Sequence, residues 1–94
     1  MTTAGPVIDN PTAHRFEMTI DGEVAAAYYK IENGRYVFTH TEVPFALSGQ
    51  GYGSKLAQAA FDAARKAGMR VIASCPFMAQ FALRHPEYAA MLDG

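Results

Sequence analysis

Two turn dipeptides, Asp21-Gly22 and Asn33-Gly34, constrain the fold of the first half of the chain more than any other feature. A two-residue hairpin turn of type I′ needs a positive φ at both residues, and Asp-Gly and Asn-Gly pairs adopt it most readily. The segments around the turns alternate apolar and polar side chains or carry aromatic and β-branched residues, as strands do. The sequence therefore predicts a three-stranded antiparallel meander, with strands at residues 15–20, 23–32 and 35–43.

The second half of the chain follows a helical spacing instead. Pro44 ends the third strand, and from Ser54 the apolar residues recur with a period of about 3.6 residues. Gly68 suits the end of this helix. The short apolar run that follows predicts a strand covered on both faces, which favours parallel pairing. We expect a helix at 54–67, a strand at 70–75, a helix at 77–84 and a last helix starting at Pro86.

These elements make one small α/β (α+β) domain in the order β-β-β-α-β-α-α. A chain of 94 residues has the length of a single domain. Residues 1–13 contain glycine, proline and other turn formers, so we expect a flexible lead-in there and the domain at residues 14–94.

The strand at 35–43, the helix at 54–67 and the strand at 70–75 form one right-handed βαβ crossover. The two strands are then parallel, and their carboxyl ends open on the same edge of the sheet. Ligands of open α/β sheets bind outside such ends. The topology therefore gathers a glycine-rich turn, His40, Glu42 and Cys75 around one site.

Composition excludes several classes of function. The formal net charge is −1 and acids and bases are interleaved, so no basic face for nucleic acid is visible. No apolar run approaches the ~20 residues that a membrane helix needs, and residues 1–10 lack the features of a signal peptide. Cys75 is the single cysteine, so no disulfide forms within the chain. We expect a cytoplasmic protein without a nucleic-acid, membrane or metal partner.

The run Gly49-Gln50-Gly51-Tyr52-Gly53-Ser54 lies between the third strand and the first helix. A glycine-rich turn before a helix forms an anion cradle, because backbone N–H groups point outward and the helix dipole adds about half a positive charge. Ser54 and Lys55 can add a hydroxyl and an ammonium group. A tight turn that needs glycine for positive φ explains the same run, and the local pattern does not separate the two readings. The run matches neither a Walker A loop nor a convincing dinucleotide-binding fingerprint.

Four motifs follow one another along the chain: His40-Thr41-Glu42-Val43-Pro44, the glycine-rich turn, Cys75-Pro76-Phe77 and His85-Pro86-Glu87-Tyr88. Together they resemble the minimal, YjdJ-type branch of the GNAT N-acetyltransferase superfamily, over roughly residues 8–92. The resemblance implies acetyl-coenzyme A as cosubstrate, with its pyrophosphate on the glycine-rich turn and its pantetheine arm along the backbone after His40. The sequence departs from the family pattern at Ser48, where relatives carry Gln or Arg, and at Gln50, where relatives often carry a basic residue.

The resemblance also implies which residues surround the cofactor. The motif at His85 would close one wall near it, although the same motif is explained by a break between two helices. Phe77 is likewise explained as a core residue. We expect cofactor contacts from Thr41, Val43, Gly49, Gln50, Gly51, Tyr52, Gly53, Ser54, Lys55, Phe77 and His85.

Acetyl transfer to an amine needs a base for the amine's proton, donors for the oxyanion and an acid for the leaving thiolate. His40 and Glu42 share a strand face about 6.7 Å apart, and either can be the base, directly or through a water. Backbone N–H groups near Thr41 to Val43 can stabilise the oxyanion. Cys75 can protonate the thiolate or carry the acetyl group as a covalent relay. The structural readings are a buried apolar Cys75, a hydrogen-bonded His40, and a Glu42 that caps the turn or pairs with Lys55.

The sequence thus predicts an N-acetyltransferase for an unidentified primary amine, in a small molecule or on a protein lysine. Direct transfer in a ternary complex is the expected route, because the chain has no second cysteine. The alternative is a non-catalytic module that binds coenzyme A, another nucleotide or a partner protein, since so short a chain has little room for an acceptor pocket. We expect a monomer or a weak homodimer, paired through strand 15–20 at a sheet edge.

Overall fold

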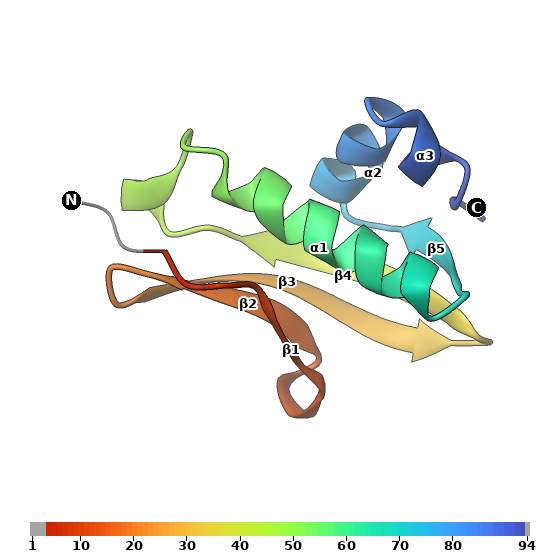
Figure 1. Cartoon of the computed structure of the whole chain (residues 1–94), viewed down its shortest axis with the longest axis horizontal. Coiled ribbons are helices and arrows are strands. Elements are labelled where there is room, and N and C mark those ends of the chain that lie inside the picture. Colours follow the sequence, from red (N-terminus) through yellow and green to blue (C-terminus); the bar gives the residue numbers. More distant parts are fainter. Residues whose placement is uncertain (1–3, 94) are drawn as a thin grey trace.

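The fold is a mixed β-sheet with helices on one of its faces (Figure 1). The computed structural model describes residues 4–93. Neighbouring strands are antiparallel except β4 and β5, which run parallel as predicted. Within the described residues the sheet has five strands in the order β1 (Ile8–Asn10), β2 (Arg15–Ile20), β3 (Glu23–Glu32), β4 (Arg35–Glu42) and β5 (Arg70–Ala73). The helices are α1 (Tyr52–Lys66), α2 (Pro76–Leu83) and α3 (Pro86–Ala89).

The two hairpin turns adopt the conformation that their dipeptides predict. The φ angles are 50° at Asp21, 82° at Gly22, 52° at Asn33 and 73° at Gly34. Both residues of each turn are therefore left-handed, as a type I′ turn requires. These turns fix where the strands begin and end, so β2 and β3 have the expected bounds and β4 differs from expectation by one residue at its end.

Strand β1 lies within residues 1–13, where the sequence predicts a lead-in without a strand. It pairs antiparallel with β2, and Asp9 accepts a hydrogen bond of 2.6 Å from the hydroxyl of Tyr29. Residues 1–3 of that lead-in and residue 94 of the predicted domain lie outside the described residues. Because β1 covers β2, the prediction that strand 15–20 is a sheet edge is wrong, and β1 and β5 are the edges of the described sheet.

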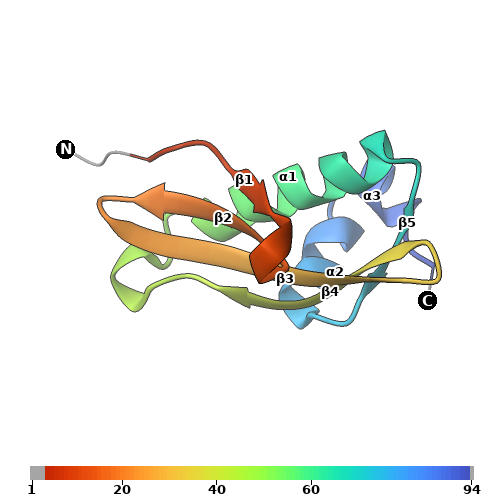
Figure 2. The same cartoon turned by 90° about the horizontal axis from the view of Figure 1, so that it is seen from below.

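The three helices pack on the same face of the sheet, and α1 lies along it (Figure 2). Phe61 of α1 is fully buried and joins the layers, because its ring contacts Phe38 of β4, Phe81 of α2 and Tyr88 of α3. The longest helix, α1, has 15 residues and starts two residues before its expected position. Within the described part of the chain, no helix is long and apolar enough to cross a membrane.

A β-bulge reverses the direction of the side chains half-way along β4. Strand β3 pairs with Phe38 and then with His40, so Thr39 is the extra residue. Thr41 pairs with the buried Ala27 and points to the helix-covered face, whereas His40 points to the opposite, uncovered face. In an uninterrupted strand the two side chains would exchange faces, because side chains alternate.

Strands β4 and β5 separate toward their carboxyl ends. Their pairing stops at Phe38 and Ala73. The amide of Cys75 still donates to the carbonyl of Phe38 at 3.0 Å, and the chain then turns into α2. Residues 39–42 of β4 consequently have no neighbouring strand on the β5 side among residues 4–93, so their backbone groups on that side face a gap.

Candidate active site

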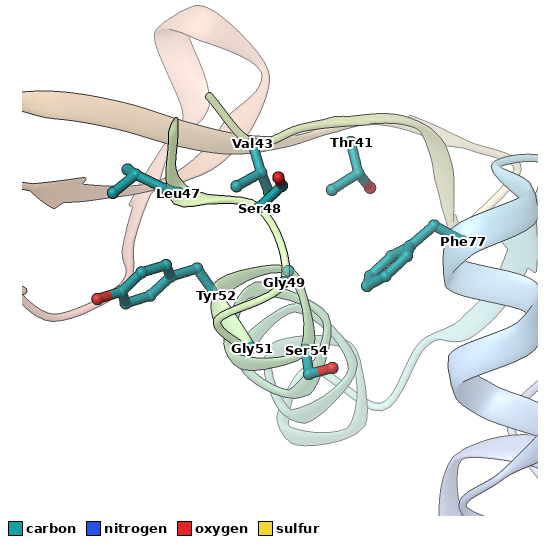
Figure 3. A pocket seen from close by; sticks show the side chains of 10 residues that line it. Thr41, Val43, Leu47, Ser48, Gly49, Gly51, Tyr52, Ser54 and Phe77 are labelled. Carbon is teal, nitrogen blue, oxygen red and sulfur yellow. The ribbon is translucent and has the colours of Figure 1, made fainter. Parts of the chain in front are cut away.

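A cavity of about 460 Å³ opens between the end of β4, the loop after it and the first turn of α1 (Figure 3). Its volume is in the range that holds a drug-sized ligand. The start of α2 closes one side. The lining consists of Thr41, Val43, Leu47, Ser48, Gly49, Gly51, Tyr52, Gly53, Ser54 and Phe77. None of these side chains is charged, so an anion bound here is held by dipoles and hydrogen-bond donors.

The glycine-rich turn needs glycine for its backbone conformation at two positions. The φ angles are 78° at Gly49 and 85° at Gly51, which is the N-cap of α1. An added Cβ would meet nothing within 4 Å at either position. Glycine is therefore needed for its left-handed conformation and not because a side chain would clash. The turn thereby brings the amide end of α1 to the cavity, where backbone N–H groups and the helix dipole favour an anion.

Two polar side chains of the turn are used to hold the loop itself. The hydroxyl of Ser48 donates to the carbonyl of Phe45 at 2.8 Å. The amide of Gln50 donates to the carbonyl of Ala46 at 3.5 Å. Both contacts stabilise the short 3₁₀ turn at Phe45–Leu47. The donors at this end of the cavity are therefore the backbone amides and the hydroxyl of Ser54.

Gly53 differs from Gly49 and Gly51, because what lies close to it is the ring of Phe77. A Cβ at Gly53 would lie 2.8 Å from Cζ of Phe77. The ring of Phe77 thus rests against the first turn of α1 and forms a wall of the cavity, with 42% of the residue exposed. Figure 3 shows this ring pointing from α2 toward α1. Phe77 is therefore not a core residue, which was the alternative that the sequence left open.

The hydroxyl of Thr41 joins the two sides of the gap between β4 and β5. Its Oγ1 lies 3.5 Å from Sγ of Cys75, a distance at which hydroxyl and thiol can hydrogen-bond in either direction. Cys75 is only 5% exposed and precedes the first residue of α2. Cys75 does not line the cavity itself, and its buried thiol contacts Thr41, which does.

His40 and Glu42 lie at the same end of the sheet, on its uncovered face. Their Nε2 and Oε1 atoms are 3.1 Å apart, so the prediction that they share a face is confirmed, and both side chains are 60% exposed. Glu42 neither caps the turn nor pairs with Lys55, whose ammonium lies over the ring of Tyr52. A carboxylate can only accept, so Nε2 is the donor of this hydrogen bond, and in the neutral imidazole the lone pair is then on Nδ1.

The ring of Tyr28 stacks on His40, with centroids 5.9 Å apart. Arg15 donates to the Tyr28 hydroxyl at 3.0 Å and to Glu17 at 2.7 Å. These hydrogen bonds, first to Tyr28 and then to Glu17, raise the pKa of the Arg15 guanidinium above its ordinary value. The uncovered face thus carries an ordered row of polar side chains that ends at the gap.

The sequence matches the family described as GCN5-related N-acetyl-transferase over residues 15–91. This chain belongs to the GCN5-related N-acetyltransferase family. The solution structure of a GCN5-like candidate N-acetyltransferase from Staphylococcus aureus is similar, with a TM-score of 0.73 and 27% sequence identity over 94% of this chain and 87% of that chain. No curated protein is significantly similar in sequence. The assignment to the YjdJ-type branch of this acetyltransferase family stays a prediction.

The cavity is lined by most of the residues that were expected, from the resemblance to acetyltransferases, to contact the cofactor. These are Thr41, Val43, Gly49, Gly51, Tyr52, Gly53, Ser54 and Phe77. Gln50, Lys55 and His85 do not line it. His85 instead packs on Phe81, with ring centroids 4.2 Å apart. Leu47 and Ser48 also line the cavity and were not among the expected contacts, and the burial of Leu47 depends on how the loop folds back.

The described residues contain no group of three or more His, Cys, Asp and Glu side chains placed to hold a metal ion. The predicted catalytic side chains occur instead in two contacting pairs. His40 contacts Glu42 on the uncovered face, and Cys75 contacts Thr41 on the helix-covered face. The gap between β4 and β5 lies beside both pairs.

Proposed function

We propose that this chain transfers the acetyl group of acetyl-coenzyme A to a primary amine. The observation that carries the proposal is one cavity that is lined both by a donor-rich glycine turn and by Thr41, whose hydroxyl contacts the thiol of Cys75 behind it. The turn suits a pyrophosphate, and the surroundings of Thr41 suit a thioester. Family membership supports the same activity.

The chemistry of the cavity fits the parts of coenzyme A. Backbone amides at Gly49–Ser54 offer several donors to a pyrophosphate without a side chain in the way. Val43, Leu47 and Phe77 supply apolar walls for the pantetheine arm. The free edge of β4 beyond Phe38 offers backbone N–H and C=O groups to the two pantetheine amides, as a strand would to its neighbour.

In this proposal the amine approaches from the uncovered face, through the gap beside β4. The amine nitrogen attacks the thioester carbonyl, so a C–N bond forms and the C–S bond breaks. Nδ1 of neutral His40 accepts the amine's proton, and Glu42 holds the ring through Nε2. The leaving thiolate takes a proton from the thiol of Cys75, whose contact with Thr41 orients it.

The first test is release of free coenzyme A from acetyl-coenzyme A in the presence of spermidine or a lysine-containing peptide. We expect His40→Gln and Cys75→Ala each to lower kcat about 100-fold, the lower range for acid–base catalysis. His14→Asn is the matched control, because His14 is exposed and lies far along the chain from the residues that line the cavity. Its φ is 55°, a left-handed conformation that Asn also adopts. Unchanged release in both variants would show that these roles are wrong.

Mass spectrometry after mixing with acetyl-coenzyme A distinguishes direct transfer from a relay. Direct transfer predicts no acetyl adduct on Cys75 during turnover. A kinetically competent adduct on Cys75 would replace the direct route by a covalent one. Tight binding of coenzyme A without release for any amine would favour the non-catalytic binding module instead.

A further inference from the structure

A second, smaller cavity of about 130 Å³ lies between α1 and α2 and is lined by Ser54, Phe77, Gln80, Phe81 and Arg84. It shares Ser54 and Phe77 with the large cavity, so the two adjoin at the first turn of α1. Ser54 is also the last residue of the glycine-rich turn. A ligand group bound to that turn is therefore within a few bonds of the smaller cavity.

Arg84 is the single charged residue in the linings of the two cavities. Each of the other arginines contacts a carboxylate: Arg15 with Glu17, Arg65 with Asp62, and Arg35 and Arg70 with Asp93. No carboxylate among residues 4–93 forms an ion pair with Arg84. Its guanidinium thus has the charge and the free donors that an anionic ligand needs.

The polar groups of the smaller cavity suit a phosphate monoester. Arg84 offers a planar fork of N–H donors, the geometry that binds phosphate oxygens in pairs. The Gln80 amide and the Ser54 hydroxyl provide neutral donors beside it. Coenzyme A carries such a group, because its adenosine ribose bears a 3′-phosphate next to the 5′-pyrophosphate.

We infer that the cavity lined by Gln80 and Arg84 binds the 3′-phosphate of coenzyme A and makes the protein prefer coenzyme A to its 3′-dephospho form. The inference rests on the proposed function, since it requires the pyrophosphate on the glycine-rich turn. It adds the fixed positive charge that the large cavity lacks. The uncharged turn binds the pyrophosphate, which both forms share, and Arg84 binds the 3′-phosphate, which the dephospho form lacks.

A purely structural explanation for Arg84 also exists. It is the C-cap of α2, where a cation is favoured by the negative end of the helix dipole. Lys66 is the last residue of α1, one position before its C-cap, lies outside both cavities and carries the same charge. Lys66→Gln is therefore the matched control for Arg84→Gln, because each removes one positive charge from a helix end.

The experiment is isothermal titration calorimetry of coenzyme A and 3′-dephospho-coenzyme A against wild type, Arg84→Gln and Lys66→Gln. A charge-assisted phosphate contact predicts that wild type binds coenzyme A at least about tenfold more tightly than the dephospho form. In Arg84→Gln we expect the two affinities to become equal, through weaker binding of coenzyme A alone. Lys66→Gln should keep the wild-type preference.

Two results would overturn the inference and leave the proposed function intact. One is equal affinity of wild type for the two ligands, and the other is an Arg84→Gln variant that keeps the preference. A loss of preference in Lys66→Gln as well would assign the effect to overall charge and reject the site. Failure of wild type to bind either ligand would reject the proposed function together with the inference.

Discussion

The hydroxyl of Thr41 and the thiol of Cys75 are in contact, 3.5 Å apart, across the gap beyond the last residue pair of β4 and β5. This contact predicts that the two residues act as a unit. Thr41→Val, which keeps the shape and removes the hydroxyl, should lower kcat about tenfold, the value of one hydrogen bond. Cys75→Ala should lower it further, and the double variant should be no slower than Cys75→Ala alone.

The measurement is steady-state release of coenzyme A with each variant, and the control is Thr19→Val. Thr19 is an exposed threonine on β2, away from the cavity, so its replacement should leave kcat unchanged. If the losses of kcat in Thr41→Val and Cys75→Ala were additive in the double variant, the two residues would not share a role.

Gly51→Ala should weaken coenzyme A binding beyond what its effect on stability explains. Gly51 has φ 85°, and alanine there costs about 1–2 kcal/mol. Gly22, in the turn between β2 and β3, has φ 82° and equally open surroundings, so Gly22→Ala imposes the same strain far from the cavity. Urea denaturation should show similar destabilisation of both, whereas calorimetry should show weaker binding only for Gly51→Ala. Equal affinities would mean that the turn does not hold the ligand.

Gly53→Ala should affect binding more than stability. The added Cβ would meet Cζ of Phe77 at 2.8 Å, and this is the end of a partly exposed side chain that can move. Alanine also favours the helix by up to about 1 kcal/mol, so we expect a net stability change below that size. The displaced ring alters the cavity wall, and coenzyme A affinity should fall. In a Phe77→Ala background the same substitution should leave affinity unchanged, and a persistent loss would show that Phe77 is not the cause.

The carboxylate of Asp93 should make the protein more sensitive to acid. Its hydrogen bond from Arg35 lowers its pKa below the ordinary value of 3.8. The unfolded chain therefore takes up a proton before the folded one, so this stabilisation is complete above that value and is lost as the pH falls through the lowered pKa. Asp93→Asn should flatten the decline of unfolding free energy between about pH 5 and pH 2.

Arg35→Gln is the companion variant for this measurement, because it removes the partner that lowers the pKa of Asp93 most, while Arg70 remains as a weaker one. It should flatten the same part of the profile, and combining it with Asp93→Asn should add little. A wild-type slope in both single variants would show that the Arg35 contact does not persist in solution.

Much of the fold was predictable because its signals are local. Asp21-Gly22 and Asn33-Gly34 determine two hairpins through the φ angles that they allow, and the resulting strand bounds agree with the structure. Strand β1 was not predictable in this way. Three residues cannot show a period, and Asp9 is held by a hydrogen bond from Tyr29, twenty residues further along the chain.

The candidate site was predictable where it follows from backbone chemistry. The glycine-rich turn and the shared face of His40 and Glu42 could be read from spacing alone. The separation of His40 and Thr41 onto two faces with different partners could not, because it depends on a bulge formed with β3. Arg84 belongs to no motif and meets a cavity only through the packing of α2 against α1.

The bulge at Thr39 determines which face of the sheet each later side chain of β4 points to. If the bulge were lost while Thr39 stayed in the strand, Thr39 would pair with Tyr28, so His40 would turn inward, Thr41 would turn outward and every later side chain would follow. Lengthening or trimming by two would preserve sidedness but shift the loop along the sheet by roughly 7 Å. The faces of His40 and Thr41 therefore depend on the bulge as much as on the residue types, and this stretch should resist insertions that other loops of the molecule accept.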